Sequence, residues 1–417
     1  MLLTVIGQGY IGLPVSVAFA AAGHTVYAAE SAPDRHQALA RGDSYIPDVP
    51  SGELRARLDS GLLRPVRDAR LAPGSDVYII ATPTPLTPAR EPDLRLVEEA
   101  LTAIAATARP GALIVLESTV YPGALRRHIA PFFERLTRLR SGEDVHFAYS
   151  PERVDPGRDL PLRVVPKLVS GLDHRAVKLA RELYETAFDV VVEVSSSEVA
   201  EFAKLYENTF RYVNVAFVNE LSKAAHAMAV PFREVVSAAA SKPYGFMSFH
   251  HGPGVGGHCL PNNIHYLNHA MSAAGHPSEM LAVAERINLS MPGYAVERLR
   301  QGLMRHGTPL SGARVLVLGR AFKAGVSDTR NSPAHTVIRL LTDAGTHVRV
   351  ADPLAGTDHA EGTRFTPVEL TREECRAADA VMLVTDHAGV DSRMVLESSG
   401  LILDCRGWFK EPEVEQL

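Results

Sequence analysis

Residues 2–12 of the chain, Leu-Leu-Thr-Val-Ile-Gly-Gln-Gly-Tyr-Ile-Gly, hold the pattern that decides the fold of its N-terminal part. The first five residues form a short apolar run that predicts a buried strand, and the glycines after them predict a tight turn. An Ala-rich amphipathic stretch then runs to Ala22 and predicts a helix, and residues 24–29 are apolar again. Strand, glycine turn, helix and strand in this order predict a βαβ unit of a parallel sheet.

The glycine turn has the spacing of a dinucleotide-binding site. Such glycines let the backbone approach a pyrophosphate, whose charge is stabilised by the N-terminus of the following helix. Glu30 ends the second strand where a ribose-binding acid is expected, and its charge would repel a 2′-phosphate, so NAD is favoured over NADP. The alternatives are a glycine turn without a ligand and a merely solvated Arg35. The predicted cofactor contacts are Gly7, Gly9, Tyr10, Ile11, Gly12, Glu30 and Arg35.

Length and composition exclude several classes of protein. The 417 residues correspond to about three domains, or two large ones and a connector, at roughly 150 residues per domain. With 46% hydrophobic and 22% charged residues, the chain has the profile of a globular protein. The net charge of -5 argues against a nucleic-acid binder, and three scattered cysteines favour the reducing cytoplasm over secretion. Glycines and Pro14 interrupt the uncharged first 23 residues, so we expect neither a signal peptide nor a membrane span there.

The rest of the chain divides into a helical middle between two α/β parts. Further strand-like runs lie at residues 77–81, 112–117 and 147–149. Residues 197–228 contain neither Gly nor Pro and predict one unusually long helix. A second, smaller α/β part has strand-like runs at residues 313–319, 348–352, 380–385 and 401–404. We therefore expect an α/β fold with an N-terminal Rossmann-like domain (1–195), a central long-helix region (196–305) and a C-terminal Rossmann-like domain (306–417).

Two features of the middle region carry reactive groups. Lys204 and Asn208 share one face of the long helix, where an ammonium and an amide together would stabilise an oxyanion. Most such pairs are simply solvated, so this pair alone does not define a site. The segment 251–259, His-Gly-Pro-Gly-Val-Gly-Gly-His-Cys, crowds four glycines before Cys259. A cysteine on such a loop is a candidate nucleophile, whereas most lone cysteines are small buried hydrophobes.

A series of motifs in chain order resembles the UDP-glucose/GDP-mannose dehydrogenases, the NAD-dependent nucleotide-sugar 6-dehydrogenases. The resemblance covers essentially the whole chain. The motifs are Gly7-x-Gly9-x-x-Gly12, Pro83-Thr84-Pro85, Ser118-Thr119-Val120, Ser150-Pro151-Glu152-Arg153, Lys204 with Asn208, Gly256-Gly257-His258-Cys259, Gly319-x-Ala321-Phe322-Lys323, Asp328-Thr329-Arg330 and Asp404-x-Arg406-Gly407.

The resemblance implies oxidation of a sugar C6 hydroxyl to a carboxylate. A hydride passes to NAD, and the Cys259 thiolate adds to the resulting aldehyde. The thiohemiacetal loses a second hydride, and water hydrolyses the thioester. Lys204 would hold the developing oxyanions and help keep Cys259 ionised, with Asn208 as a neutral donor. Glu152 and Thr119 would position or activate water.

The resemblance also implies which residues bind the ligands. Residues 1–195 would bind NAD, residues 196–305 would form the dimer and carry the cysteine loop, and residues 306–417 would bind the UDP-sugar. Cofactor contacts are implied for Thr84, Thr119 and Arg330, although a local ion pair with Asp328 is the alternative for Arg330. Substrate contacts are implied for Glu152, Arg153, Lys204, Asn208, Tyr244, Gly256, Lys323 and Arg406. No metal site is expected.

The sequence departs from the family pattern at two positions. Asn263 stands four residues after Cys259, where family members usually carry an aspartate. An amide can donate a hydrogen bond but cannot take up a proton, so the later steps of the reaction are in doubt more than substrate binding. Asn331 replaces a glutamate of the family, and we expect this change to be peripheral.

The remaining expectations concern the substrate, the partner and competing functions. The Gly-Pro-Gly-Val-Gly-Gly-His-Cys form of the loop resembles enzymes acting on UDP-N-acetylhexosamines and some UDP-glucose enzymes, which favours UDP over GDP. Apolar residues on more than one face of the long helix predict a homodimer. The alternatives are an enzyme that stops at the 6-aldehyde, a non-catalytic sugar-nucleotide-binding relative, and a β-hydroxyacid dehydrogenase, which needs no thiol and lacks a second α/β domain.

Overall fold

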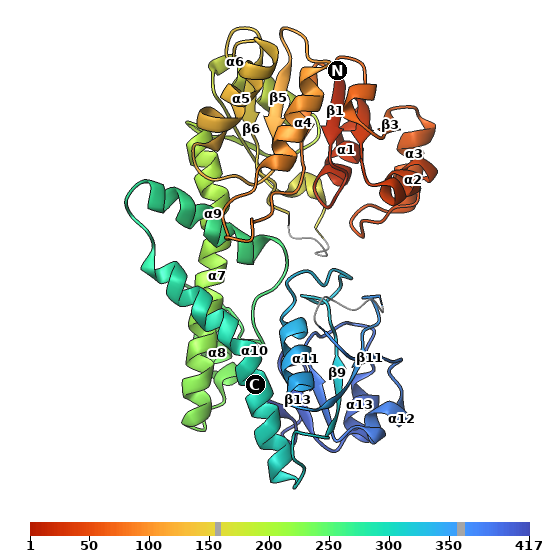
Figure 1. The fold of residues 1–417 in the computed structure, drawn as a ribbon, viewed down its shortest axis with the longest axis vertical. Helices are drawn as coiled ribbons and strands as arrows, with labels where there is room; N and C mark the ends of the chain where they lie inside the picture. Colours follow the sequence, from red (N-terminus) through yellow and green to blue (C-terminus); the bar gives the residue numbers. More distant parts are fainter. Residues whose placement is uncertain (155–159, 357–362) are drawn as a thin grey trace. The chain divides into compact units, whose positions relative to one another are not determined.

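The computed structural model describes residues 1–154, 160–356 and 363–417, which form two compact units. The first unit comprises Met1–Glu207 and His265–Pro277, and the second comprises Asn208–Ile264 and Ser278–Leu417. Each unit contains one sheet with helices packed against it (Figure 1). The predicted α/β fold class, with Rossmann-like domains before and after a helical region, is confirmed.

The sheet of the first unit has the strand order β3-β2-β1-β4-β5-β6-β7-β8. Neighbouring strands are parallel except for β6 and β7, which are antiparallel. The strands are β1 Leu2–Ile6, β2 Thr25–Ala29, β3 Leu63–Val66, β4 Val77–Ile80, β5 Leu113–Leu116, β6 His146–Tyr149, β7 Lys167–Gly171 and β8 Val191–Glu193. The α-helices are α1 Gly12–Ala21, α2 Pro33–Arg41, α3 Ser51–Asp59, α4 Arg95–Ala105, α5 Ala130–Thr137 and α6 His174–Tyr184.

Side chains that alternate along these strands fill a core on each face of the sheet. On one face, Leu3 of β1 belongs to a buried cluster with Leu13 of α1 and Leu183 of α6. On the other face, Phe147 of β6 meets Phe133 of α5 edge-on, with 5.7 Å between the ring centroids. Because both faces are covered, the central strands are continuous apolar runs in the sequence.

The sheet of the second unit is parallel throughout its described pairs, in the order β11-β10-β9-β12-β13-β14. Its strands are β9 Arg314–Leu318, β10 His347–Ala351, β11 Thr366–Pro367, β12 Ala380–Leu383, β13 Ile402–Asp404 and β14 Glu415–Gln416. The helices of this unit are α8 Phe232–Ala240, α10 Glu279–Arg305, α11 Pro333–Asp343, α12 Arg372–Ala377 and α13 Ser392–Ser398. Val317 packs toward α10 and α11, and its neighbour Leu318 packs toward α13.

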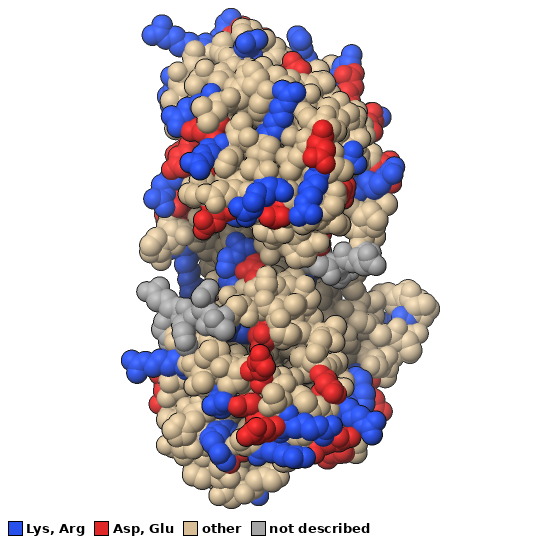
Figure 2. All heavy atoms as spheres, turned by 90° about the vertical axis from the view of Figure 1, so that its right-hand side faces the viewer, with Lys and Arg blue, Asp and Glu red and all other residues tan. Residues whose placement is uncertain are grey.

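Two further helices, α7 (Ser197–Ala227) and α9 (Cys259–Ala273), each begin in one unit and end in the other. The long helix predicted for residues 197–228 is therefore present and ends one residue earlier. Every helix within the described residues is too short or too polar to cross a lipid bilayer. Figure 2 shows basic and acidic side chains interspersed on one face of the molecule, as is usual for a hydrated surface.

Candidate active site

The carboxyl edge of the first unit's sheet gathers four of the predicted site residues. Gly7 follows β1, Thr84 follows β4, Thr119 follows β5 and Glu152 follows β6. These strands are parallel neighbours, so the residues that follow them emerge at the same edge. The chain direction across the sheet reverses between β1 and β4, which is where open α/β sheets bind ligands.

The glycine turn between β1 and α1 is closed on one side and open on the other. Gly7 has a φ of +89°, and a Cβ there would lie 2.8 Å from the carbonyl oxygen of Ala81. A Cβ at Gly12 would overlap the carbonyl oxygen of Gly7, whereas a Cβ at Gly9 would meet open space within the described part of the chain. Among described residues no side chain caps α1 at Ile11, although the Leu13 N–H already donates to the Gly9 carbonyl oxygen at 3.2 Å and Pro14 has no N–H. This turn fits a pyrophosphate.

Glu30 lies beside the glycine turn, and its side chain is only 3% exposed. Its carboxylate accepts hydrogen bonds from the backbone N–H of Gln8 at 3.2 Å and of Ala32 at 2.9 Å. Arg35 forms an ion pair with Glu30 at 3.2 Å and is otherwise half-exposed. The acid is thus fixed at the end of β2, next to the turn that would hold the pyrophosphate. Tyr10 is half-buried in the same turn.

Thr84 and Thr119 are held by neighbours that the sequence did not single out. Thr84 is buried, and its side chain bonds to the Tyr266 hydroxyl, which also donates to the Pro85 carbonyl oxygen at 3.0 Å. Thr119 is half-buried. The segment after it is tied to α7 by the buried Glu201, whose carboxylate accepts the N–H groups of Gly123 and, at 2.9 Å, Leu125. No sequence signal distinguished Glu201 from the other glutamates of α7.

Glu152 and Lys204 are buried and interact electrostatically within the first unit. Burial raises the pKa of Glu152, but the Lys167 ammonium, the Val154 N–H and the Lys204 ammonium together outweigh that effect, and the pKa lies below its usual value. Lys167 Nζ lies 2.8 Å from the Glu152 carboxylate. Arg153, a predicted substrate contact, forms an ion pair with Glu207 at 2.6 Å. Its guanidinium is therefore bound to α7 in this structure.

The cysteine loop of the second unit packs against the segment that follows β9. A Cβ at Gly256 would lie 2.8 Å from the carbonyl oxygen of Asn331, and a Cβ at Gly257 would lie 2.8 Å from the ring of Phe322. Asn331 itself has a φ of +52° and donates from Nδ2 to the Gly257 carbonyl oxygen at 3.1 Å. The expectation that Asn331 is peripheral is therefore wrong, because this residue orients the loop before Cys259.

Cys259 is exposed and is the first residue of α9, where the helix N-terminus favours a negative charge. Asn263 lies one turn further along α9 and is only 4% exposed. Its Nδ2 has no hydrogen-bond partner among the described residues. Burial and the Arg330 guanidinium lower the pKa of His258, which favours a neutral imidazole beside the thiol. On α7, the Nδ2 of Asn208 is likewise buried without a partner in the described chain.

Other predicted contacts of the second unit differ in how firmly they are held. Arg330 forms the local ion pair with Asp328, at 2.6 Å, that was the alternative to a cofactor contact. Arg406 donates from Nε to the Val384 carbonyl oxygen at 2.6 Å. Lys323 Nζ lies 5.9 Å from the centre of the Phe322 ring. Tyr244 lies in the turn after α8 and is 72% exposed.

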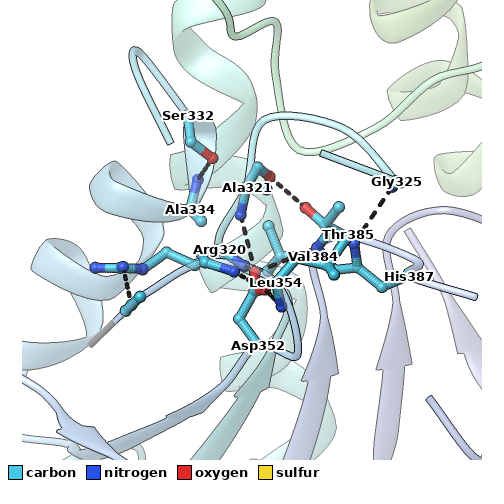
Figure 3. A network of polar contacts seen from close by, with 12 residues as sticks. Arg320, Ala321, Gly325, Ser332, Ala334, Asp352, Leu354, Val384, Thr385 and His387 are labelled. Atoms are coloured by element: carbon cyan, nitrogen blue, oxygen red, sulfur yellow. Dashed lines mark hydrogen bonds and ion pairs between the residues drawn. The ribbon is translucent and has the colours of Figure 1, made fainter. Parts of the chain in front are cut away.

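A buried network of polar contacts fixes both ends of the segment that carries Lys323 (Figure 3). The Asp352 carboxylate accepts the N–H groups of Arg320 at 2.5 Å and Ala321 at 3.1 Å. The imidazole of His387 lies 3.2 Å from the same carboxylate and accepts the Gly325 N–H at 3.3 Å on its other nitrogen. Both ends of the segment are thereby held. Neither Asp352 nor His387 was predicted from the sequence to belong to the site.

Comparison with protein families matches almost the whole chain. The models of the UDP-glucose/GDP-mannose dehydrogenase family match residues 1–188 with the NAD binding domain, 198–290 with the central domain and 316–411 with the UDP binding domain.

Individual proteins are similar over the same extent. A UDP-N-acetyl-D-mannosamine dehydrogenase of Pyrococcus horikoshii is 34% identical, over 99% of this chain and 97% of its own. A UDP-N-acetyl-D-glucosamine 6-dehydrogenase of Pseudomonas aeruginosa is 31% identical, over 93% of this chain and 90% of its own. The solved structure of a UDP-D-ManNAc dehydrogenase from Pyrococcus horikoshii superimposes with a TM-score of 0.89, at 32% identity, and covers 100% of this chain and 99% of that one.

Proposed function

The chain belongs to the UDP-glucose/GDP-mannose dehydrogenase family, and on that premise we propose that it oxidises C6 of a UDP-N-acetylhexosamine or of UDP-glucose to the uronic acid. The observation that carries this proposal is Cys259, an exposed thiol at the first residue of α9, after a loop that Phe322 and Asn331 hold from one side. A nucleophile of this kind is needed because an aldehyde becomes able to lose a second hydride once a thiolate has added to it.

Each catalytic residue has a proposed part in this reaction. The Cys259 thiolate attacks the aldehyde carbon, and the ammonium of Lys204 stabilises the oxyanion that forms. Asn208 donates a further hydrogen bond to the reacting oxygen. Glu152 and Thr119 orient the water that hydrolyses the thioester.

The glycine turn and Glu30 would hold the cofactor of this family, NAD. The overlaps that a Cβ would cause at Gly7 and Gly12, and the position of Glu30 at the end of β2, fit a bound dinucleotide. Two molecules of NAD, bound one after the other, would each accept one hydride. Thr84, Thr119 and Arg330 are the further proposed contacts, together with Gly9, Tyr10, Ile11 and Arg35.

The division of the chain by ligand remains a proposal. Residues 1–195 would bind NAD, residues 196–305 would mediate dimerisation and carry Cys259, and residues 306–417 would bind the UDP-sugar. The proposed substrate contacts outside the reacting centre are Arg153, Tyr244, Gly256, Lys323 and Arg406. A uronic acid carried on UDP is a donor for glycosyl transfer, so we place the product in polysaccharide or glycoside synthesis.

A homodimer built on α7 is proposed from the exposed apolar side chains of that helix. Phe202, Tyr206, Phe210 and Phe217 are each at least 40% exposed in the single chain. A second copy of the chain would cover this surface. A monomer in sedimentation equilibrium at micromolar concentration would refute the dimer. The free, exposed thiol of Cys259 is the reason to propose the reducing cytoplasm as the location.

The test of the function is a count of NADH formed per sugar, with NAD and a panel of UDP- and GDP-sugars. The proposal expects two NADH per UDP-sugar. One NADH with free aldehyde would identify an enzyme that stops at the first oxidation, and none with any sugar would indicate a non-catalytic binding protein. Cys259→Ser should abolish thioester formation.

Asn263 adds a kinetic expectation to the same assay. Without a carboxylate at this position, hydrolysis of the thioester should limit turnover, so NADH should appear in a burst and the acyl-enzyme should be detectable by mass. Asn263→Asp should raise the steady-state rate with little change in KM. A fast steady state without burst or adduct would mean that another group compensates for the missing carboxylate.

A further inference from the structure

Lys167 is a buried lysine that lies between two buried carboxylates. It is the first residue of β7, and its side chain is 2% exposed. Its Nζ lies 2.8 Å from Glu152 and 3.0 Å from Glu117, a residue that follows β5 and is fully buried. The hydroxyl of Tyr184, on α6, donates to the second oxygen of Glu117. Lysines are almost never buried to this degree unless they are paired, and here the two carboxylates compensate the charge of Lys167.

The Glu152 carboxylate uses both oxygens within this cluster. One oxygen accepts the backbone N–H groups of Arg153 at 2.6 Å and Val154 at 2.7 Å. The other oxygen accepts Lys167 Nζ. Backbone and ammonium donors favour the ionised form of a carboxyl and fix its plane. Glu152 is therefore held in one orientation by groups from its own loop and from β7.

Glu117 has fewer donors than Glu152. Burial raises its pKa, against the opposing effect of the Lys167 ammonium. Glu152 has two backbone N–H donors in addition to Lys167, and Lys204 lies near it, whereas the additional donor to Glu117 is the Tyr184 hydroxyl. The two carboxylates therefore share one ammonium, and Glu152 has the larger number of donors.

We propose that Lys167 is a positioning residue that keeps Glu152 ionised and oriented, with Glu117 as the second counter-ion of the same ammonium. The inference rests on the proposed function in one respect, that Glu152 acts on the water of hydrolysis. It deepens that role, because a carboxylate held in this way orients water through a fixed negative charge. The groups that face Glu152 are Lys167, Glu117, Tyr184 and Lys204.

The decisive experiment compares pH profiles of turnover for the unmodified enzyme and for Lys167→Met. Without the ammonium, two buried carboxyls face each other and must share one proton, as in any closely spaced pair. The acidic limb of the kcat profile should therefore shift to higher pH by at least about one unit. At a given acidic pH the rate is then about tenfold lower, with KM little changed. Lys167→Met/Glu117→Gln should move the limb back, and Lys167→Arg should retain the original profile.

Two controls separate a role in charge from a role in stability. Lys178→Met, on the solvent-exposed side of α6, removes a lysine that is 65% exposed and should leave the profile unchanged. NAD affinity, which depends on the glycine turn after β1, reports whether each variant is folded. Should Lys167→Met fail to fold, Lys167→Gln retains a donor without the charge and serves the same comparison.

An infrared measurement tests the inference without turnover, so that failure of the proposed function would not obscure it. The spectrum of the unmodified protein minus that of Glu152→Gln should show an ionised carboxylate at pH 6, and the same difference in the Lys167→Met background should show a protonated carboxyl. Superimposable pH profiles and an ionised Glu152 in both backgrounds would overturn the proposal. Absence of turnover with every UDP-sugar would refute the function and leave the infrared result to decide on Lys167.

Discussion

The first strand of each sheet is followed by the same kind of glycine turn, but the acid beside that turn makes different hydrogen bonds in the two sheets. Gly7 follows β1 with a φ of +89°, and its N–H donates to the Ala29 carbonyl oxygen at 2.9 Å. Gly319 follows β9 with a φ of +81°, and its N–H donates to Ala351 at the same distance. In both sheets the residue that follows this carbonyl is an acid: Glu30 comes directly after β2, and Asp352 comes directly after β10.

The difference lies in what the acid binds. Asp352 accepts backbone N–H groups from Arg320, Ala321, Leu354 and Ala355 and an imidazole contact from His387, so both oxygens are fully used. These donors, against the effect of burial, hold its pKa well below the usual value.

The two turns also differ in how soon a helix follows them. Helix α1 begins at Gly12, directly after its turn, whereas α11 begins only at Pro333 and is capped by the Ser332 hydroxyl. The acid beside the C-terminal turn thus accepts four backbone N–H groups, whereas Glu30 beside the N-terminal turn accepts two, those of Gln8 and Ala32. The same strand order can therefore surround an acid with many protein donors or one with few.

The largest expected effect comes from closing the N-terminal turn. In Gly12→Ala the new Cβ would overlap the Gly7 carbonyl oxygen, so the backbone must move and NAD binding should be lost. Gly319→Ala would overlap the Thr385 carbonyl oxygen and is the matched variant. It should lower stability and leave NAD affinity within about twofold, because Gly319 is not among the proposed NAD contacts. Calorimetric titration with NAD measures both. Equal losses of affinity would remove the distinction between the turns.

Asp352→Asn should cost about 4 kcal/mol of unfolding free energy, as is typical when one partner leaves a buried charged network. An amide presents two N–H groups where the carboxylate accepted hydrogen bonds from the backbone. Urea unfolding of the variant measures the loss. Glu30→Gln, the equivalent change in the other turn, should cost less than about 1 kcal/mol, because this acid has fewer protein donors. If the two variants lost equal stability, the acids would be structurally equivalent.

The second unit should also be sensitive to acid through His251. Burial lowers the pKa of this imidazole from 6.5 to about 4. Between these pH values the unfolded chain binds a proton that the folded chain does not, so the unfolding free energy falls as the pH falls, by up to about 3 kcal/mol. His251→Asn should flatten this dependence in urea unfolding at pH 7.5 and pH 5. An unchanged slope would assign the acid sensitivity to other groups.

The smallest expected effect concerns cofactor choice. Glu30→Ala removes the carboxylate beside the N-terminal turn, and the ratio of kcat/KM for NAD over NADP should fall by about tenfold to a hundredfold, because a charge repulsion is lost. Asp352→Ala, where it folds, should leave this ratio unchanged. Equal rates with NAD and NADP in the unmodified protein would show that Glu30 does not face the ribose.

The sequence predicted those parts of the fold that are buried on both sides. Strands β1, β4 and β5 are continuous apolar runs, and the glycine turn was identified from spacing alone. Strand β3 was missed because it lies at the sheet edge and contains Arg64 and Pro65. Strand β7 was missed because it begins with Lys167, a residue type that sequence analysis places in solvent.

In the candidate site, too, the sequence predicted some residues and missed others. Cys259 was singled out because glycine-rich sequence is itself a signal of close backbone contacts. Asn331 was taken as peripheral, since neither its positive φ nor its hydrogen bond to Gly257 is visible in the sequence. Glu201 and Lys167 depend on partners at least 15 positions away, and one sequence contains no record of those pairings.

The contrast among the cysteines makes the protein convenient for chemical labelling. Cys259 is exposed, whereas Cys375 and Cys405 are buried, and burial raises the pKa of Cys405 to about 12. Alkylating reagents react with thiolates, so iodoacetamide near neutral pH should modify the folded protein once per chain. The mass of that single adduct would count reactive centres in a preparation. By the same reasoning, peroxide should reach this thiol before the other two, and a reductant in storage buffers should preserve the protein in its native form.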